Sequence, residues 1–134
     1  MTVLQKFFIL LSLGIFITRT IQGQIPFDTL KSSIEKVNKT LPKRIDAYTR
    51  MDSIHAIRPD LVHYYGTISN MNLTDERIFQ LKRFQESRIL HAIQTEDRFK
   101  AFRDSKVKVI YEYNDSNGVF LFSFLLTPDK YLKK

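Results

Sequence analysis

The stretch YEYNDSNGVFLFSFLLTPDK, Tyr111 to Lys130, contains two β-strand patterns on either side of a turn signal. Asn117-Gly118 is the signal, because this dipeptide supplies the positive φ that tight hairpin turns need. The strand after the turn, Val119 to Thr127, has a single polar side chain, Ser123, among its first eight residues. A strand at the surface of a small protein normally alternates apolar with polar side chains. This strand therefore presents a second apolar face, which raises the question of what covers that face.

Three further strands are predicted from residue type and alternation. Val107 to Asn114 directly precedes the turn. Upstream, Ile54 to Ile57 and Leu61 to Ile68 are rich in β-branched and aromatic residues. The turn Arg58-Pro59-Asp60 lies between these two strands, so they are expected to form a hairpin.

Two helices are predicted from apolar residues spaced three and four apart. The first is Ile25 to Leu41, with Asp28 as its expected N-cap and Pro42 as the residue that ends it. The second runs from the capping residue Thr74 to about Phe102. Gln94 to Asp97 is expected to divide this second segment in two.

The order of these elements is α-β-β-α-β-β, with no clear pattern for residues 43–53. This order predicts an α+β fold, in which a four-stranded antiparallel sheet has the two main helices packed on one face. The 134 residues suffice for one domain and not for two. Residues 24–134 are therefore expected to form a single domain.

Residues 1–23 have the pattern of a secretory signal peptide. Lys6 places a positive charge before the 11-residue apolar run FFILLSLGIFI, and Gly23 provides a small residue at the expected cleavage site. The run is shorter than the roughly 20 apolar residues of a membrane span. The sequence therefore predicts an exported protein, periplasmic or secreted, with an uncleaved N-terminal anchor in the inner membrane as the alternative.

The chain carries a net charge of +7 and has no cysteine. Removal of residues 1–23 takes away Lys6 and Arg19, which leaves 19 basic and 14 acidic residues and a net charge of +5. Such a protein is expected to attract anionic partners, with weak contact to an anionic membrane surface as one case, whereas export argues against nucleic acid. Because it lacks the disulfides that small exported proteins often contain, its core and helices alone must stabilise the fold.

Motifs for catalysis or cofactor binding are absent from the sequence. The three histidines, His55, His63 and His91, lack the spacing of a zinc site. No cysteine or G-x-S-x-G motif supplies a nucleophile, and neither Gly66 nor Gly118 belongs to a phosphate-binding loop. We therefore expect no catalytic residue, no cofactor and no metal. Four basic residues of the second helix are expected to form a solvated face rather than a patch for an acidic partner: Arg77, Lys82, Arg83 and Arg88.

The order of the elements resembles that of cystatin-like α+β domains. Three stretches are also similar to a pattern in small exported bacterial proteins of uncharacterised function: LPKRIDAYTRMDSI (41–54), LVHYYGTI (61–68) and FRDSKVKVIYEYNDSNGVFLFSFLLTP (102–128). Members of that group often carry a pair of cysteines, which this chain lacks. The resemblance implies a fold and no activity. The Q-x-V-x-G motif of cystatin inhibitors is absent, and Arg58-Pro59-Asp60 occupies the corresponding turn, so protease inhibition is not implied.

These features favour a non-enzymatic binding or accessory protein of the cell envelope that acts through protein–protein contact. The expected partner is another envelope or exported protein, or a second copy of the chain in a homodimer. The expected contact residues are aromatic residues of the sheet, since tyrosine suits half-wet contacts: Tyr64, Tyr65, Tyr111, Tyr113, Phe120, Phe122 and Phe124. Two alternatives remain open. One is an inhibitor or immunity protein that neutralises an exported toxin or hydrolase, and the other is a small α+β enzyme with His63, Tyr65 or Tyr111 in a pocket.

Overall fold

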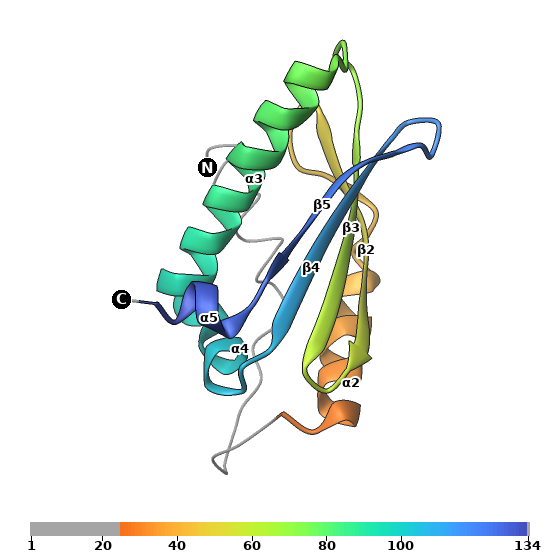
Figure 1. Cartoon of the computed structure of the whole chain (residues 1–134). Coiled ribbons are helices and arrows are strands. Elements are labelled where there is room, and N and C mark those ends of the chain that lie inside the picture. The colour runs from red at the N-terminus through yellow and green to blue at the C-terminus, as the bar shows by residue number, and fades with distance from the viewer. Residues whose placement is uncertain (1–24, 134) are drawn as a thin grey trace.

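The computed structural model describes residues 25–133, which form one sheet and flanking helices (Figure 1). The predicted signal peptide, residues 1–23, and the alternative membrane anchor therefore lie outside the described residues. Along the chain the elements are α2 (Phe27–Asn38), β1 (Lys43–Arg44), β2 (Thr49–Arg58), β3 (Leu61–Ile68), α3 (Asp75–Thr95), the 3-10 helix η1 (Asp97–Phe99), α4 (Lys100–Asp104), β4 (Lys108–Asp115), β5 (Phe120–Leu126) and α5 (Pro128–Tyr131).

The sheet has five strands in the order β1-β2-β3-β4-β5, one more than the four predicted. β3 and β4 run parallel, from Leu61 opposite Lys108 to Ile68 opposite Asp115, whereas the other three pairs are antiparallel. The mixed α and β class is confirmed, but the prediction of an all-antiparallel sheet is wrong for this central pair. The reason is the connection, since α3, η1 and α4 carry the chain back along the sheet and β4 starts beside the start of β3 (Figure 1).

β1 and the first part of β2 occupy residues 43–53, where the sequence shows no clear pattern. Asp46 builds the turn between them, because its Oδ1 accepts the backbone N–H groups of Tyr48 and Thr49 at 2.8 Å each. β2 therefore begins at Thr49, well before the predicted start at Ile54. Two irregularities in its pairing with β3 interrupt the period-two pattern, which explains why the sequence underestimates its length.

α2 is shorter than the helix that the sequence predicts. It begins at Phe27 with Pro26 in the N-cap position and no side-chain cap. Asp28, the predicted cap, lies instead in the first turn, where its charge still suits the positive end of the helix. At the other end, the Asn38 amide binds both backbone groups of Ile54, with Nδ2 donating to the carbonyl oxygen at 2.7 Å and Oδ1 accepting from the N–H at 2.9 Å. This pair of bonds attaches the end of α2 to β2.

α3 begins as predicted, because the Thr74 hydroxyl accepts a backbone N–H of the first turn at 3.2 Å. The predicted break is also present, since α3 and η1 are separated at Glu96. Arg103 stabilises this corner by donating from Nη1 to the backbone oxygens of Ile93 and Glu96, both at 2.7 Å. Within residues 25–133, no helix combines the length and the apolar character that a membrane span needs.

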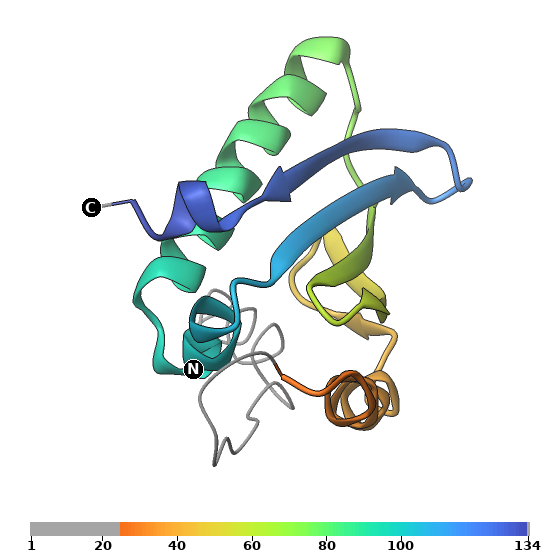
Figure 2. The same ribbon diagram turned by 60° about the horizontal axis from the view of Figure 1, so that its bottom comes forward.

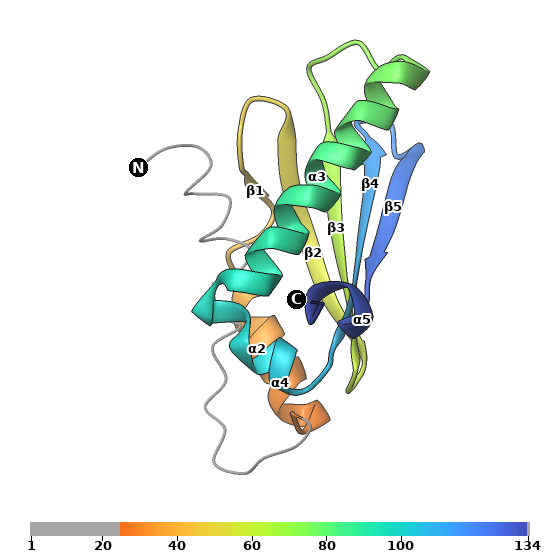
Figure 3. The same ribbon diagram turned by 60° about the vertical axis from the view of Figure 1, so that its left-hand side comes forward.

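The core lies between the sheet and the two main helices, which sit on the same side of it (Figures 2 and 3). α2 packs against β2, and α3 packs against β5. Gly66 leaves room for a neighbouring ring, because a Cβ at this position would lie 2.8 Å from Cε1 of Tyr113. The inner face of the sheet consists of strand residues with at most 5% of their surface exposed: Met51, Ile54, Val62, Tyr64, Ile68, Val109, Tyr111, Tyr113, Phe122, Phe124 and Leu126.

Only one of the two apolar faces of β5 is covered by the helices. Phe122 and Phe124 point into the core, while Leu125 on the other face is 41% exposed. The main helices of the described chain leave that face uncovered (Figure 3). Strict alternation predicts that Phe120 shares a face with Phe122 and Phe124, and this prediction is wrong. An irregularity in the pairing sets Phe120 opposite Asn114, and its side chain is 57% exposed.

Candidate functional site

The outer face of the sheet, opposite the helices, carries a group of polar and aromatic side chains that we name the outer-face cluster: His55, His63, Tyr65 and Glu112. β3 contributes His63 and Tyr65, which share a face because they are two residues apart. The pairing of the strands sets His55 of β2 opposite His63, and Glu112 of β4 opposite Tyr65. Three strands thus bring four side chains together in the middle of the sheet.

Close ring contacts hold the outer-face cluster together. The rings of His63 and Tyr65 stack, with centroids 4.1 Å apart and planes inclined by 12°. His55 meets the Tyr65 ring edge-on, at 5.5 Å between centroids. The Tyr65 hydroxyl lies 3.2 Å from Nδ1 of His63, and Nε2 of His63 lies 3.5 Å from Oε1 of Glu112. The imidazole of His63 is therefore placed between a phenol and a carboxylate.

Burial determines the protonation of this cluster. Burial lowers the pKa of His63; the Glu112 carboxylate opposes that shift, and His55 adds to it. His63 is therefore neutral at pH 7, and the 3.5 Å contact of its Nε2 with Glu112 is an ion pair only when the ring is protonated. Burial also raises the pKa of Tyr65, helped by Glu112, so the hydroxyl stays protonated. The cluster thus offers a phenol donor, a neutral imidazole and a carboxylate.

The chemistry available to the cluster is binding and proton transfer. A neutral imidazole beside a phenol is able to accept a proton from a bound group. Tyr111, the third residue of the enzyme alternative, lies on the inner face, on the opposite side of the sheet from His63 and Tyr65. Among residues 25–133, no three His, Cys, Asp or Glu side chains are arranged to hold a metal ion. Of the residues named in that alternative, His63 and Tyr65 therefore lie together and Tyr111 lies apart from them.

Apolar and charged side chains flank the outer-face cluster on opposite sides. Ile110 pairs with His63, and Leu125 pairs with Ile110, so an apolar strip extends toward the edge of the sheet at β5. Toward β2 the surface becomes charged, where Arg50 and Asp52 form an ion pair. Aromatic residues at the centre with charges at the rim are the composition of protein–protein interfaces.

The structure divides the seven predicted contact residues between the two faces of the sheet. Tyr65 is half-buried on the outer face, and Phe120 is exposed at the end of β5. The other five face the core with at most 5% of their surface exposed: Tyr64, Tyr111, Tyr113, Phe122 and Phe124. These five serve packing and are not accessible to a partner, so contact through Tyr65 and Phe120 stays a prediction.

The buried tyrosines form a stacked layer beneath the sheet. Tyr64 and Tyr111 are nearly parallel, with ring centroids 4.4 Å apart, and Phe124 extends the stack at 5.5 Å from Tyr111. The hydroxyls of Tyr64 and Tyr111 interact with each other, whereas the hydroxyl of Tyr113 makes no hydrogen bond within residues 25–133. Burial raises the pKa of all three, so they remain neutral. Ring stacking therefore stabilises this layer.

His55 and Glu112 are the members of the cluster that sequence reasoning misses. The shared face of His63 and Tyr65 follows from alternation alone, and His55 faces His63 once the hairpin is assumed. The position of Glu112 next to Tyr65 depends on the parallel pairing of β3 and β4, for which the sequence contains no local signal.

The basic residues of α3 cover aromatic rings at the surface. The Arg83 guanidinium lies 5.8 Å from the centroid of Phe79, and that of Arg88 lies 4.8 Å from the centroid of Phe84. Both phenylalanines are more than half exposed. Arg77 and Arg83 are exposed, as predicted for a solvated face, whereas Lys82 and Arg88 are half-buried and burial lowers the pKa of Arg88.

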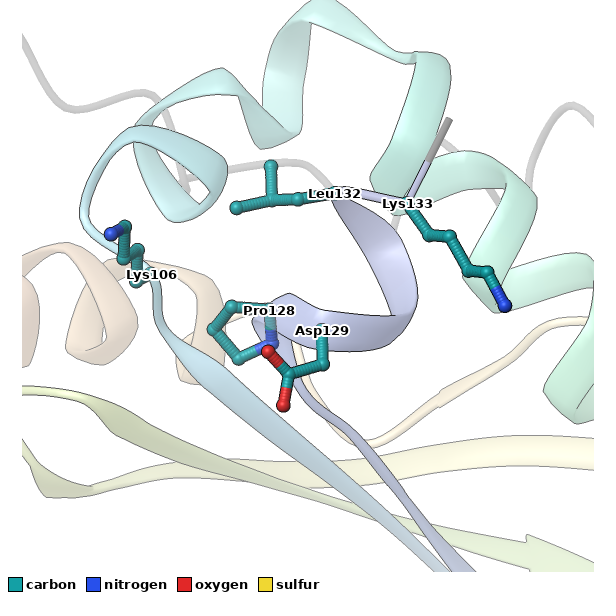
Figure 4. Close-up of a pocket in the computed structure, with 5 residues that line it drawn as sticks. All are labelled: Lys106, Pro128, Asp129, Leu132 and Lys133. Carbon is teal, nitrogen blue, oxygen red and sulfur yellow. The ribbon is translucent and has the colours of Figure 1, made fainter.

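An open pocket of about 330 Å³ lies beside α5 (Figure 4). Pro128 and Leu132 form its apolar part, and Lys106, Asp129 and Lys133 line the remainder. The charged ends of the two lysines point away from each other (Figure 4), so they do not converge on a common ligand. We assign no chemistry to this pocket.

A solved structure with a similar fold is a "putative secreted protein" (PA3611) from Pseudomonas aeruginosa. The TM-score is 0.56 at 11% sequence identity, and the match covers 72% of this chain and 88% of that one. At this identity the likeness concerns the fold alone. None of the curated proteins matches the chain in sequence. The two matches that were found name no cystatin, so the cystatin-like resemblance is not confirmed.

The family comparison covers most of the chain. A family model described as a domain of unknown function (DUF8479) matches residues 26–122. The matched span contains α2, α3, the first four strands and the whole outer-face cluster. The chain therefore belongs to the DUF8479 family.

Proposed function

We propose that this protein is an exported, non-enzymatic accessory protein of the cell envelope that binds another protein through the outer face of its sheet. The observation that carries the proposal is the outer-face cluster, an ordered group of aromatic and polar side chains on a face that the two main helices leave uncovered. The signal-peptide pattern of residues 1–23 supports export, and a protein of similar fold is described as secreted.

The chemistry of the face supports a polypeptide as the partner. The Tyr65 hydroxyl and the neutral His63 ring suit hydrogen bonding to backbone or side-chain amides, because both groups are uncharged. The strip of Ile110 and Leu125 suits an apolar side chain. Glu112 suits a basic or amide group. A polypeptide surface with mixed polar and apolar character therefore fits better than a small charged metabolite.

A photo-crosslinking experiment tests the position of the contact. A benzophenone amino acid replaces His55 on the outer face in the chain produced by its own host, and in a second variant it replaces Phe84 on α3, which is also exposed. The His55 position is expected to give one defined protein adduct and the Phe84 position none. An adduct from both positions, or from neither, contradicts the proposal. The identity of the captured protein distinguishes an envelope component from an exported toxin or hydrolase.

A matched pair of substitutions tests the role of the cluster in affinity. Tyr65→Ser removes the central ring, and the loss of a central interface tyrosine weakens binding by roughly tenfold or more. Tyr48→Ser is the control, because Tyr48 is a 46% exposed tyrosine in the loop between β1 and β2. Equal binding by the two variants, with unchanged circular dichroism, would exclude the outer face as the contact.

Mass spectrometry of the protein recovered from its own host tests export. Cleavage after Gly23 is expected to give a chain that begins at Gln24. Recovery of the full chain, beginning at Met1 and associated with membranes, supports the alternative of an uncleaved anchor. Recovery of the full chain from the cytoplasm contradicts export.

A further inference from the structure

The two edges of the sheet differ sharply in charge. β1 and β5 are the edge strands. β1 consists of two exposed basic residues, Lys43 and Arg44. By contrast, Val119 to Thr127 contains no charged residue and no proline. Charged residues and proline are the usual means by which natural sheets prevent their edges from pairing with other strands. β5 itself lacks these means. The charged group that the structure places on its edge is Lys130, whose Nζ bonds the Leu125 carbonyl oxygen, and a second strand would have to displace it there.

The sequence of β5 reads the same in both directions around Ser123. Leu121-Phe122-Ser123-Phe124-Leu125 is a palindrome. If two such strands lie antiparallel about a two-fold axis at Ser123, then Ser123 faces Ser123, Phe122 faces Phe124, and Leu121 faces Leu125. Every side chain therefore meets an identical or equally apolar one, as the isologous interface of a two-fold dimer requires.

The backbone of β5 presents hydrogen-bonding groups along this edge. Nζ of Lys130 donates to the carbonyl oxygen of Leu125 at 2.9 Å, so this oxygen points away from β4. Backbone groups alternate in direction along an antiparallel edge, so the N–H and C=O groups of Ser123 point outward as well. The pairing irregularity between Phe122 and Phe120 ends the regular strand near Leu121. The available edge is therefore centred on Ser123.

We infer that the protein forms a two-fold symmetric homodimer in which the β5 strands of two copies pair antiparallel about Ser123. The two five-stranded sheets then join into one of ten strands, with the helices of both copies on the same side. The two Ser123 residues exchange a pair of backbone hydrogen bonds. The exposed apolar residues at the ends of β5 add contact area: Val119, Phe120, Leu125 and Leu132 are each at least 41% exposed. The dimer uses the edge of β5 and none of the outer-face cluster, and Leu125 is the one residue that it shares with the apolar strip, so the dimer does not depend on the proposed function.

Light scattering combined with size exclusion tests the dimer on the protein recovered from its own host. The full chain has a mass of 15.8 kDa. At micromolar concentration the measured mass is expected to be twice that of the single chain. Each copy carries a positive net charge, so added salt strengthens this apolar pairing, whereas it weakens binding to an anionic surface. A monomer at all concentrations up to about 100 μM overturns the inference, because the dissociation constant of a stable dimer lies well below that concentration.

A charge swap at the two-fold axis tests the register. Ser123→Lys sets two ammonium groups directly opposite each other across the axis, and Ser123→Glu does the same with two carboxylates. Each variant alone is expected to be a monomer, and an equal mixture of the two is expected to form a dimer. Ser123 also faces Glu112 within its own sheet, so circular dichroism must first show that the Ser123→Glu variant is folded. If it is not folded, a second pair of variants takes its place. Leu125→Lys alone is expected to abolish the dimer, and adding Leu121→Glu in the same chain is expected to restore it.

The control is Gln80→Lys, which places the same charge on an exposed position of α3 and is expected to leave the dimer intact. Two folded charge variants that both remain dimeric, or a mixture that remains monomeric, contradict pairing about Ser123. If Gln80→Lys abolishes the dimer, the interface does not lie at β5.

Discussion

The buried tyrosines of this protein differ in whether the side-chain hydroxyl makes a hydrogen bond. The hydroxyl of Tyr131 donates to the backbone oxygen of Val107 at 2.7 Å. The hydroxyl of Tyr113 is fully buried and makes no hydrogen bond within residues 25–133. A made hydrogen bond contributes about 1 kcal/mol to stability, whereas a buried unpartnered group costs about 1–3 kcal/mol. The two residues should therefore respond oppositely to loss of the hydroxyl.

Replacement of each tyrosine by phenylalanine tests this difference. Tyr113→Phe is expected to leave the free energy of unfolding unchanged or to raise it by up to about 2 kcal/mol, because the ring packing is kept. Tyr131→Phe, the matched control, is expected to lower it by about 1 kcal/mol. Urea denaturation measures both changes. An equal loss in the two variants means that the Tyr113 hydroxyl is satisfied, for example by a buried water.

The lowered pKa of His63 predicts how stability depends on pH. Below the unfolded pKa of about 6.5, the unfolded chain binds a proton that the folded chain resists, so stability falls as the pH drops through that value toward the folded pKa. Glu96 acts in the opposite sense, because burial raises its pKa in the folded state and stability gains as the pH falls. The two effects must therefore be separated.

His63→Gln separates them, since it removes the histidine and keeps Glu96. The unfolding midpoint of the natural protein, measured between pH 5 and 7.5, is expected to decline more steeply on acidification than that of the variant. His91→Gln is the control for loss of an exposed histidine. Because His91 also lowers the pKa of Glu96, the same control is repeated in a Glu96→Gln background. Identical slopes for the natural protein and His63→Gln would show that this ring does not resist protonation in the fold.

At the level of elements, local signals identify most of the boundaries. Leu61–Ile68 is a strand as predicted, and Thr74 caps α3 as predicted, because alternation and capping depend only on neighbouring residues. Two features escape this reasoning. β1 is too short to show a pattern, and the irregular pairing at Phe120 reverses a face assignment that strict alternation predicts.

The packing of β3 against β4 predicts a strict requirement at position 66. Gly66→Ala would place a Cβ 2.8 Å from Cε1 of Tyr113 and 3.2 Å from the backbone oxygen of Arg50, so the strand or the ring must move. Overpacking of this kind typically costs about 1–3 kcal/mol, which denaturant unfolding detects. Combining Gly66→Ala with Tyr113→Leu is expected to cost less than the sum of the two single changes. Full additivity would show that the ring is not the obstacle.

For comparison, Gly118→Ala meets no atom within 4 Å, and its cost comes only from the positive φ of 82°. That cost is about 1 kcal/mol, because an L-residue strains in the left-handed region. The two glycines therefore serve different purposes, one in packing and the other in the turn.

The strands of the sheet differ in the number of neighbouring strands that pair with them. β3 and β4 are flanked by strands on both sides, whereas β1 and β5 each have one neighbour. Amide hydrogen exchange is therefore expected to be slowest in β3 and β4 and fastest in β1. The Ser123 amide provides a further readout, since its exchange should slow as the protein concentration rises if the dimer forms. Uniform protection across all five strands would contradict this distribution.

The sequence alone determined the two main helices, the two strand hairpins, the aromatic composition of the core and the apolar character of both faces of β5, because each depends on residues close together in the chain. Only the tertiary structure decided that β3 and β4 pair in parallel, that the helices cover the face of Tyr64 and Tyr111, and that Glu112 joins His63 and Tyr65. Those outcomes depend on how α3 carries the chain back across the sheet, which is a contact between distant segments. The same crossing leaves β5 at the edge, where its palindromic sequence has no neighbour within the chain.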